Sequence, residues 1–143
     1  MPSRIQRQST TPTTAAARIK GPKEVSVMAW IENQFGEVLL LKQSNGRRLW
    51  TLPGGKVRTR EALATALRRE VLEETGLQLK SLEFAHLFDR PRKSTITFVY
   101  RVTLRGKDTV VPKANEIETA QYWATLPRSA TPSLAFFWKQ RRG

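Results

Sequence analysis

The sequence of 143 residues contains no cysteine and a single histidine, His86. Without cysteine the chain cannot form a disulfide scaffold, a thiolate metal site or a thiol nucleophile. One histidine cannot build a zinc centre from histidines alone, and His86 lies in an apolar stretch that is typical of a packed core residue. Any metal ion must therefore be held by oxygen ligands.

Long apolar runs are also absent. No segment approaches the roughly 18 to 20 apolar residues that cross a bilayer, and the N-terminus lacks the continuous apolar stretch of a secretory signal. We therefore expect a soluble, cytoplasmic protein without a membrane partner.

Acidic residues are scarce. Asp and Glu number 12 against 25 Lys and Arg, which gives a formal net charge of +13. Such an excess favours polyanions or phosphorylated small molecules as partners. The length and the 39% hydrophobic content are sufficient for one domain with a core and too small for two ordinary domains.

Residues 1–23 contain no acid and carry five basic residues around a Ser/Thr/Pro-rich centre. This composition predicts a basic disordered tail, which leaves 24–143 as the folded domain. Acid-free, Arg-rich segments also serve as organelle transit peptides or as arms that bind nucleic acid or membrane surfaces. Pro2 and Pro12 would interrupt an amphipathic helix, and the role of the tail stays open.

The patterning after residue 23 predicts an α/β fold. β-rich apolar segments predict strands at 25–31, 37–42, 49–52, 82–89, 95–104 and 121–126. Pro53, Gly54 and Gly55 stop the third segment and predict a tight turn that exposes the backbone. Helices are expected at 61–75, with Thr59 as N-cap and Gly76 as the C-terminal stop, and at 133–142.

Three carboxylates share one face of the first of these helices, those of Glu70, Glu73 and Glu74. Like charges at this spacing destabilise a helix unless a cation neutralises them. Oxygen ligands of this type favour Mg²⁺ or Mn²⁺. The helix pattern alone also fits a solvated acidic face paired with Arg68 and Arg69.

The wider context of this helix has a specific spacing. Gly55 is followed after five residues by Glu61, and after seven more by the run Arg69-Glu70-Val71-Leu72-Glu73-Glu74-Thr75-Gly76-Leu77. This segment resembles the Nudix box, G-x5-E-x7-R-E-U-x-E-E-x-G-U with U a bulky apolar residue, at every specified position. The segments 50–56 and 116–127 are also similar to the family, so the resemblance spans most of 24–127.

The resemblance implies an α/β/α sandwich around a mixed β-sheet, in which the box forms loop, helix and loop. It also implies hydrolysis, with Mg²⁺ or Mn²⁺, of a nucleoside diphosphate linked to another moiety X. The products would be a nucleoside monophosphate and phosphorylated X. Among small nucleotides, we rank nucleoside triphosphates above ADP-ribose and other ADP-sugars, with dinucleoside polyphosphates third.

The same resemblance assigns Glu70, Glu73 and Glu74 as metal ligands, and the carbonyl of Gly54 or Gly55 as an added backbone ligand. A pyrophosphate repels nucleophiles, so water needs both cations on the phosphate oxygens and a carboxylate that takes its proton. Either Glu70 or Glu73 would be that general base.

Three further acidic or basic residues, Glu116, Glu61 and Arg69, are also assigned a role, in two cases with an alternative to it. Glu116 stands where many members carry an extra loop glutamate that binds metal or acts as base, although it also reads as an exposed loop acid. In the family, the residues at the positions of Glu61 and Arg69 brace the box, while direct phosphate contact is the alternative for Arg69.

Substrate contacts are assigned to three residues near the box. Lys56 and Arg58 are tied by position to the box loop and suit a phosphate-rich substrate. Trp50 would either stack on a nucleobase or pack against neighbouring side chains.

Two other functions remain open from the sequence. Removal of pyrophosphate from a triphosphorylated RNA 5′ end is favoured by the charge of +13 and the basic tail. A non-catalytic Nudix domain that binds nucleotides or nucleic acid is the second, although a pure binder has no need for clustered glutamates. A homodimer could use Trp123 or the aromatic residues at 136–138, which could equally close the core.

Overall fold

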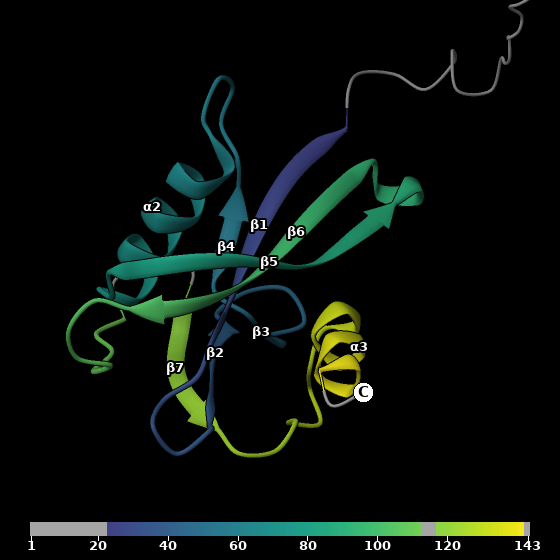
Figure 1. The fold of residues 1–143 in the computed structure, drawn as a ribbon. Coiled ribbons are helices and arrows are strands. Elements are labelled where there is room, and N and C mark those ends of the chain that lie inside the picture. Colours follow the sequence, from purple (N-terminus) through teal and green to yellow (C-terminus); the bar gives the residue numbers. More distant parts are fainter. Residues whose placement is uncertain (1–22, 113–116, 142–143) are drawn as a thin grey trace, which may run out of the picture.

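The computed structural model describes residues 23–112 and 117–141 (Figure 1). The predictions for the tail at 1–22 and for Glu116 lie outside these residues. In chain order the elements are β1 (Glu24–Ile31), β2 (Val38–Gln43), β3 (Trp50–Thr51), β4 (Gly54–Lys56), α2 (Leu63–Thr75), β5 (Leu79–Arg90), the 3₁₀ turn η3 (Pro91–Lys93), β6 (Thr95–Leu104), β7 (Ile117–Trp123) and α3 (Pro132–Gln140).

The strands form two sheets. The first has the order β4-β1-β6-β5 and is mixed, because β1 and β6 run parallel while β4 and β5 are antiparallel to their neighbours. The second has the order β3-β2-β7 and is antiparallel throughout. No helix in the described part of the chain is long and apolar enough to span a membrane.

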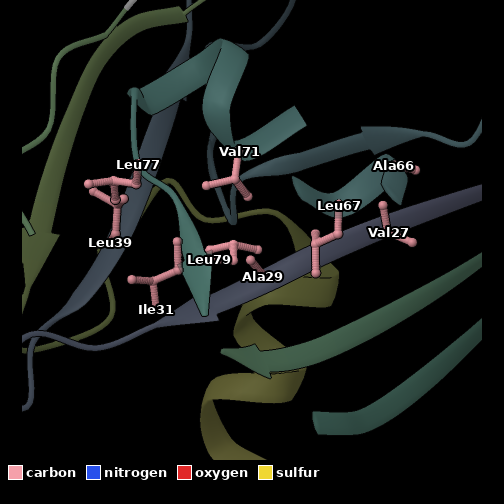
Figure 2. Close-up of a cluster of buried hydrophobic side chains, with 9 residues drawn as sticks. All are labelled: Val27, Ala29, Ile31, Leu39, Ala66, Leu67, Val71, Leu77 and Leu79. Atoms are coloured by element: carbon pink, nitrogen blue, oxygen red, sulfur yellow. The ribbon is translucent and has the colours of Figure 1, made fainter. Parts of the chain in front are cut away.

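Helices cover both faces of the strands because side chains alternate along β1. Val27, Ala29 and Ile31 point to the core under α2, which Figure 2 shows together with Leu39, Ala66, Leu67, Val71, Leu77 and Leu79. The intervening Trp30 belongs to a second core, in which it contacts Phe137 of α3. The predicted α/β/α sandwich around a mixed sheet is therefore confirmed.

The prediction of a turn at Pro53-Gly54-Gly55 is wrong in part, because Gly54 and Gly55 lie in β4 and pair with β1. Gly54 has a φ of 154°, and a Cβ at this position would lie 2.0 Å from the Val27 carbonyl oxygen. Only glycine lets β4 approach β1 this closely. The two glycines thus bring the box loop against the sheet instead of turning it away.

The helix boundaries also differ from the expectation. α2 begins after Ala62, which makes no side-chain cap, so the assignment of Thr59 as N-cap is wrong. The segment before the helix is a turn, in which the Glu61 N–H donates to the Arg58 carbonyl at 3.0 Å. Gly76 ends α2 in the left-handed conformation, as expected, with φ 77°.

Candidate active site

α2 carries the three clustered glutamates and is fixed by its apolar side. Ala66, Leu67 and Val71 are fully buried in the core beneath the helix. This anchoring turns the neighbouring positions around the helix, which carry the glutamates, towards β4. The three carboxylates nevertheless lie in different environments. Glu74 is buried at 8% exposure, whereas the Glu73 side chain is 53% exposed.

Two of these carboxylates lie against the backbone of β4. The Gly54 N–H donates to Glu74 Oε1 at 3.0 Å. A Cβ on Gly55 would lie 2.4 Å from Glu70 Oε2, so the Glu70 carboxylate fills the space that the missing side chain leaves. The structure therefore brings together Gly54, Gly55, Glu70 and Glu74, four of the five residues assigned to metal from the sequence.

Glu70 has a carboxylate whose charge is only partly compensated. Burial raises its pKa above the ordinary value, and the neighbouring charge of Glu73 acts in the same direction. Arg69 opposes this shift through a contact of 3.2 Å between its Nη1 and Glu70 Oε2. The net direction is upward, because the effect of burial exceeds that of Arg69.

Arg69 joins the helix to the loop that precedes it. Its Nε donates to Glu61 Oε2 at 2.8 Å and its Nη2 to Glu61 Oε1 at 2.9 Å, a bidentate pair. The same Nη2 donates to the Lys56 carbonyl at 3.1 Å. Hydrogen bonds from Arg69 and from the Arg58 N–H lower the pKa of Glu61 to about 2. The pair expected from the sequence is present, and it ties β4, the loop and α2 together.

The donor set fits a divalent cation, although no three acidic or histidine side chains of the described residues converge into a preformed metal site. Glu73 instead directs Oε1 towards Arg69 Nη1 at 3.5 Å. The carboxylates of Glu70 and Glu74 beside the backbone of Gly54 and Gly55, with Glu73 on the same helix, are the hard oxygen ligands that Mg²⁺ and Mn²⁺ prefer. The charge of Glu70 is only partly compensated by Arg69, which is consistent with a cation at this face.

A hollow of about 230 Å³ opens beside Glu74. This hollow was not predicted from the sequence, because its polar lining residues come from separate elements: Gln43 ends β2, Asn45 follows it and Thr51 lies in β3. The amide side chains of Gln43 and Asn45 at the end of a buried strand are its only signal in the sequence. The lining residues are Leu41, Gln43, Asn45, Thr51, Leu52, Gly54, Glu74 and Ile117.

The three residues assigned to substrate have different surroundings. Lys56 and Arg58 are exposed beside the box loop, where both line a hollow of about 360 Å³. Lys56 Nζ also pairs with Glu24 Oε2 at 3.2 Å. Trp50 is only 8% exposed and packs edge-on against Trp123 with ring centroids 4.9 Å apart, which leaves its ring little surface for a nucleobase.

Glu118, the neighbouring acid in the 115–118 segment, is engaged in ion pairs. Arg48 Nε donates to Glu118 Oε1 at 2.8 Å, and Lys42 Nζ lies 4.0 Å from Oε2. The hydrogen bond from Arg48 lowers the pKa of this carboxyl. Its charge is thus directed to β2 and the following loop instead of to α2.

The chain is similar to a known protein family and to several curated proteins. The family model described as NUDIX domain matches residues 22–140. The chain is 28% identical over 101 residues to a MutT-like protein of Streptomyces ambofaciens, a match that covers 71% of this chain and 63% of that protein. It is 30% identical over 109 residues to the human 8-oxo-dGDP phosphatase, covering 75% of this chain and 33% of that protein.

Solved structures of similar fold are matched over a larger share of their own length than the curated proteins are. A MutT NUDIX hydrolase from Burkholderia pseudomallei superposes with a TM-score of 0.75 and 25% identity, and the match covers 85% of this chain and 98% of that one. A MutT protein from Methanosarcina mazei Go1 has a TM-score of 0.68 and 30% identity, with coverage of 85% and 94%. The curated relatives are longer, and the chain spans less than two thirds of each of the two described above.

Proposed function

This chain belongs to the Nudix family, and on that premise we propose that it is a pyrophosphohydrolase, dependent on Mg²⁺ or Mn²⁺, that cleaves a nucleoside diphosphate linked to a second group. One observation carries the proposal: the carboxylates of Glu70 and Glu74 lie against the Gly54–Gly55 backbone, with Glu73 on the same helix face. A helix that served only as a solvated surface would not place two of its three acids against glycine backbone, one of them buried.

In this function Glu70, Glu73 and Glu74 would hold the cation, with a carbonyl of Gly54 or Gly55 as a further ligand. When bound, the cation neutralises phosphate oxygens and acidifies the attacking water. Glu70 or Glu73 accepts the proton of that water. The water oxygen forms a bond to one phosphorus while the bridging P–O bond breaks, which yields a nucleoside monophosphate and a phosphorylated second product.

Substrate contacts are proposed on two sides of this helix face. The exposed Lys56 and Arg58 side chains provide positive charge for phosphates beside the box loop. The hollow next to Glu74 offers Gln43, Asn45 and Thr51 as polar groups among apolar side chains, a lining suited to part of a nucleoside. We place nucleoside triphosphates first as substrates, and the name of the human relative, an 8-oxo-dGDP phosphatase, supports purine nucleotides in particular.

The test is phosphate release, after a coupled phosphatase, from nucleoside triphosphates, 8-oxo-dGDP, ADP-ribose, ADP-sugars, dinucleoside polyphosphates and triphosphorylated RNA. Each is assayed with Mg²⁺, with Mn²⁺ and with chelator. We expect turnover of a nucleoside triphosphate or 8-oxo nucleotide that chelator abolishes. Preference for ADP-ribose or RNA would replace the proposed substrate, and a folded protein inert on the whole panel would refute the enzymatic function.

A further inference from the structure

Positive charge gathers at the end of the four-stranded sheet where β1 and β6 begin and β5 ends (Figure 1). The turn that joins β5 to β6 carries Arg90, Arg92 and Lys93. Among the described residues none of these three has an ion-pair partner within 4.0 Å. Asp89, the acid next to them, is already paired with Lys23 at 2.8 Å. The turn therefore presents positive charge that acidic neighbours do not neutralise.

An apolar hollow of about 660 Å³ lies directly beside this turn, between η3 and the start of α3. Phe88 and Phe136 provide aromatic surface, with their ring centroids 5.6 Å apart, and Phe136 is 45% exposed. The guanidinium of Arg90 lies over the Phe88 ring at 5.8 Å from its centroid. Phe88 and Phe136 meet edge to face, so the exposed ring of Phe136 offers a stacking surface beside the cationic turn. This arrangement matches a flat ring that carries a phosphate, the chemistry of an unpaired nucleotide.

The positive surface continues from this turn towards the box loop. The Glu24 N–H donates to the Ser94 carbonyl at 2.8 Å, which holds the start of β1 against the turn. Lys23 lies at this junction and also lines the hollow that contains Lys56 and Arg58. Lys23 pairs with Asp89 and Lys56 with Glu24. The basic residues of this path without an ion-pair partner within 4.0 Å among the described residues are therefore Arg90, Arg92 and Lys93 on one side of the junction and Arg58 on the other.

We propose that this end of the sheet binds single-stranded nucleic acid, with one base in the hollow formed by Phe88 and Phe136 and adjacent phosphates on Arg92 and Lys93. A single strand fits because its bases are free to leave the stack, whereas the bases of a duplex are not. The proposal concerns binding alone and holds whether or not the chain hydrolyses small nucleotides.

The test measures binding of a fluorescein-labelled 12-nucleotide oligouridylate to the full chain by anisotropy, in EDTA so that cleavage cannot interfere. The double variant Arg92→Gln/Lys93→Gln should bind at least about tenfold more weakly. Its plot of log affinity against log salt should be shallower by about 1.4, because each lost phosphate contact on a single strand removes about 0.7. Phe136→Ala, with its fold verified by circular dichroism, should also weaken binding about tenfold, through lost stacking.

A matched control is available on the same two strands. Lys80→Gln/Arg105→Gln removes the same charge from exposed side chains at the opposite end of β5 and β6, and it should leave the affinity within about twofold. Equal losses in both double variants would reduce the effect to net charge and overturn the site. Displacement of the oligomer by uridine monophosphate at equal nucleotide concentration would also overturn it, in favour of a mononucleotide pocket.

Two further measurements separate this proposal from its alternatives. Binding to vesicles of phosphatidylserine and phosphatidylcholine, with no binding of the oligomer, would overturn it in favour of a lipid surface. Hydrolysis of a small nucleotide, assayed with metal, should be the same in Arg92→Gln/Lys93→Gln as in the wild type. A chain that binds RNA at this site but is inert on the substrate panel would retain this inference and lose the proposed function.

Discussion

Three glutamates of one helix have identical chemistry and different surroundings. Glu74 is buried and accepts a hydrogen bond from the Gly54 N–H, while Glu70 rests on Gly55 beside Arg69. Glu73 is half exposed and has only a 3.5 Å contact with Arg69. Because burial fixes Glu74, this residue contributes to local structure as well as to any cation, whereas Glu73 contributes to chemistry alone.

This difference predicts the outcome of Glu73→Gln. The variant loses a ligand and a proton acceptor without losing a buried contact, so turnover should fall by about 100-fold or more while the melting temperature stays within about one degree. Steady-state hydrolysis and a thermal scan measure both quantities. Glu83→Gln, which changes an exposed acid on β5, should alter neither. An active Glu73→Gln protein would refute the role assigned to this residue.

The two glycines of β4 should respond in opposite ways to alanine. A Cβ on Gly55 meets the end of the flexible Glu70 side chain, so Gly55→Ala displaces a carboxylate and should cost activity with little change in stability. A Cβ on Gly54 meets the Val27 backbone at 2.0 Å in a positive-φ conformation, so Gly54→Ala should lower the melting temperature by several degrees. Paired activity and melting measurements distinguish them, and equal destabilisation in both variants would contradict the argument.

At the scale of elements, the sequence predicted most where local pattern and tertiary packing agree. β6 has its expected bounds because Ile96, Phe98 and Tyr100 lie on one face of the strand and alternate with residues on the other face. β4 was missed because its pairing with β1 depends on the absence of side chains at Gly54, which a propensity argument treats as a turn signal. β7 begins at Ile117 instead of 121 because it pairs with β2 as far as Gln43, a contact between distant segments.

The site shows the same division. The spacing of the box located the carboxylates and the pair of Glu61 with Arg69, since both follow from helical periodicity and a short loop. The burial of Trp50 and the hollow beside Glu74 depend on β2, β3 and β7 meeting in space. The pattern of a single sequence carries no information on contacts between distant strands, so these features are seen only in the structure.

The bidentate pair that ties the box loop to α2 predicts an acid dependence of stability. The pKa of Glu61 is lowered to about 2 from an ordinary value of 4.5. The pair therefore stabilises the fold fully above about pH 4.5, and this contribution is lost as the pH falls from 4.5 towards 2. The melting temperature of the wild type should exceed that of Glu61→Gln by a constant margin between pH 5 and 7, and the margin should narrow below pH 4.5. A margin unchanged at pH 2.5 would disprove this account.

At the scale of the whole molecule, the two cores on opposite faces of the strands make the box helix one wall of the sandwich and α3 the other. The carboxylate face of α2 and the aromatic hollow at α3 are therefore built on separate cores. Because the two cores consist of different residues, a change at one site should leave the other folded, so the binding and hydrolysis tests can be interpreted independently.

The last prediction uses the stability of the whole fold to detect the cation. A ligand that binds only the native state stabilises it by RT ln(1 + [L]/Kd), or about 2.7 kcal/mol at 100 times Kd. Saturating Mg²⁺ should thus raise the melting temperature by several degrees, and chelator should reverse the shift. Since a chain of net charge +13 also responds to salt, NaCl of equal ionic strength is the control. Glu73→Gln should lose most of the Mg²⁺ shift and keep the salt response. If NaCl reproduces the full shift, or if Glu73→Gln retains it, the carboxylate face of α2 does not hold the cation.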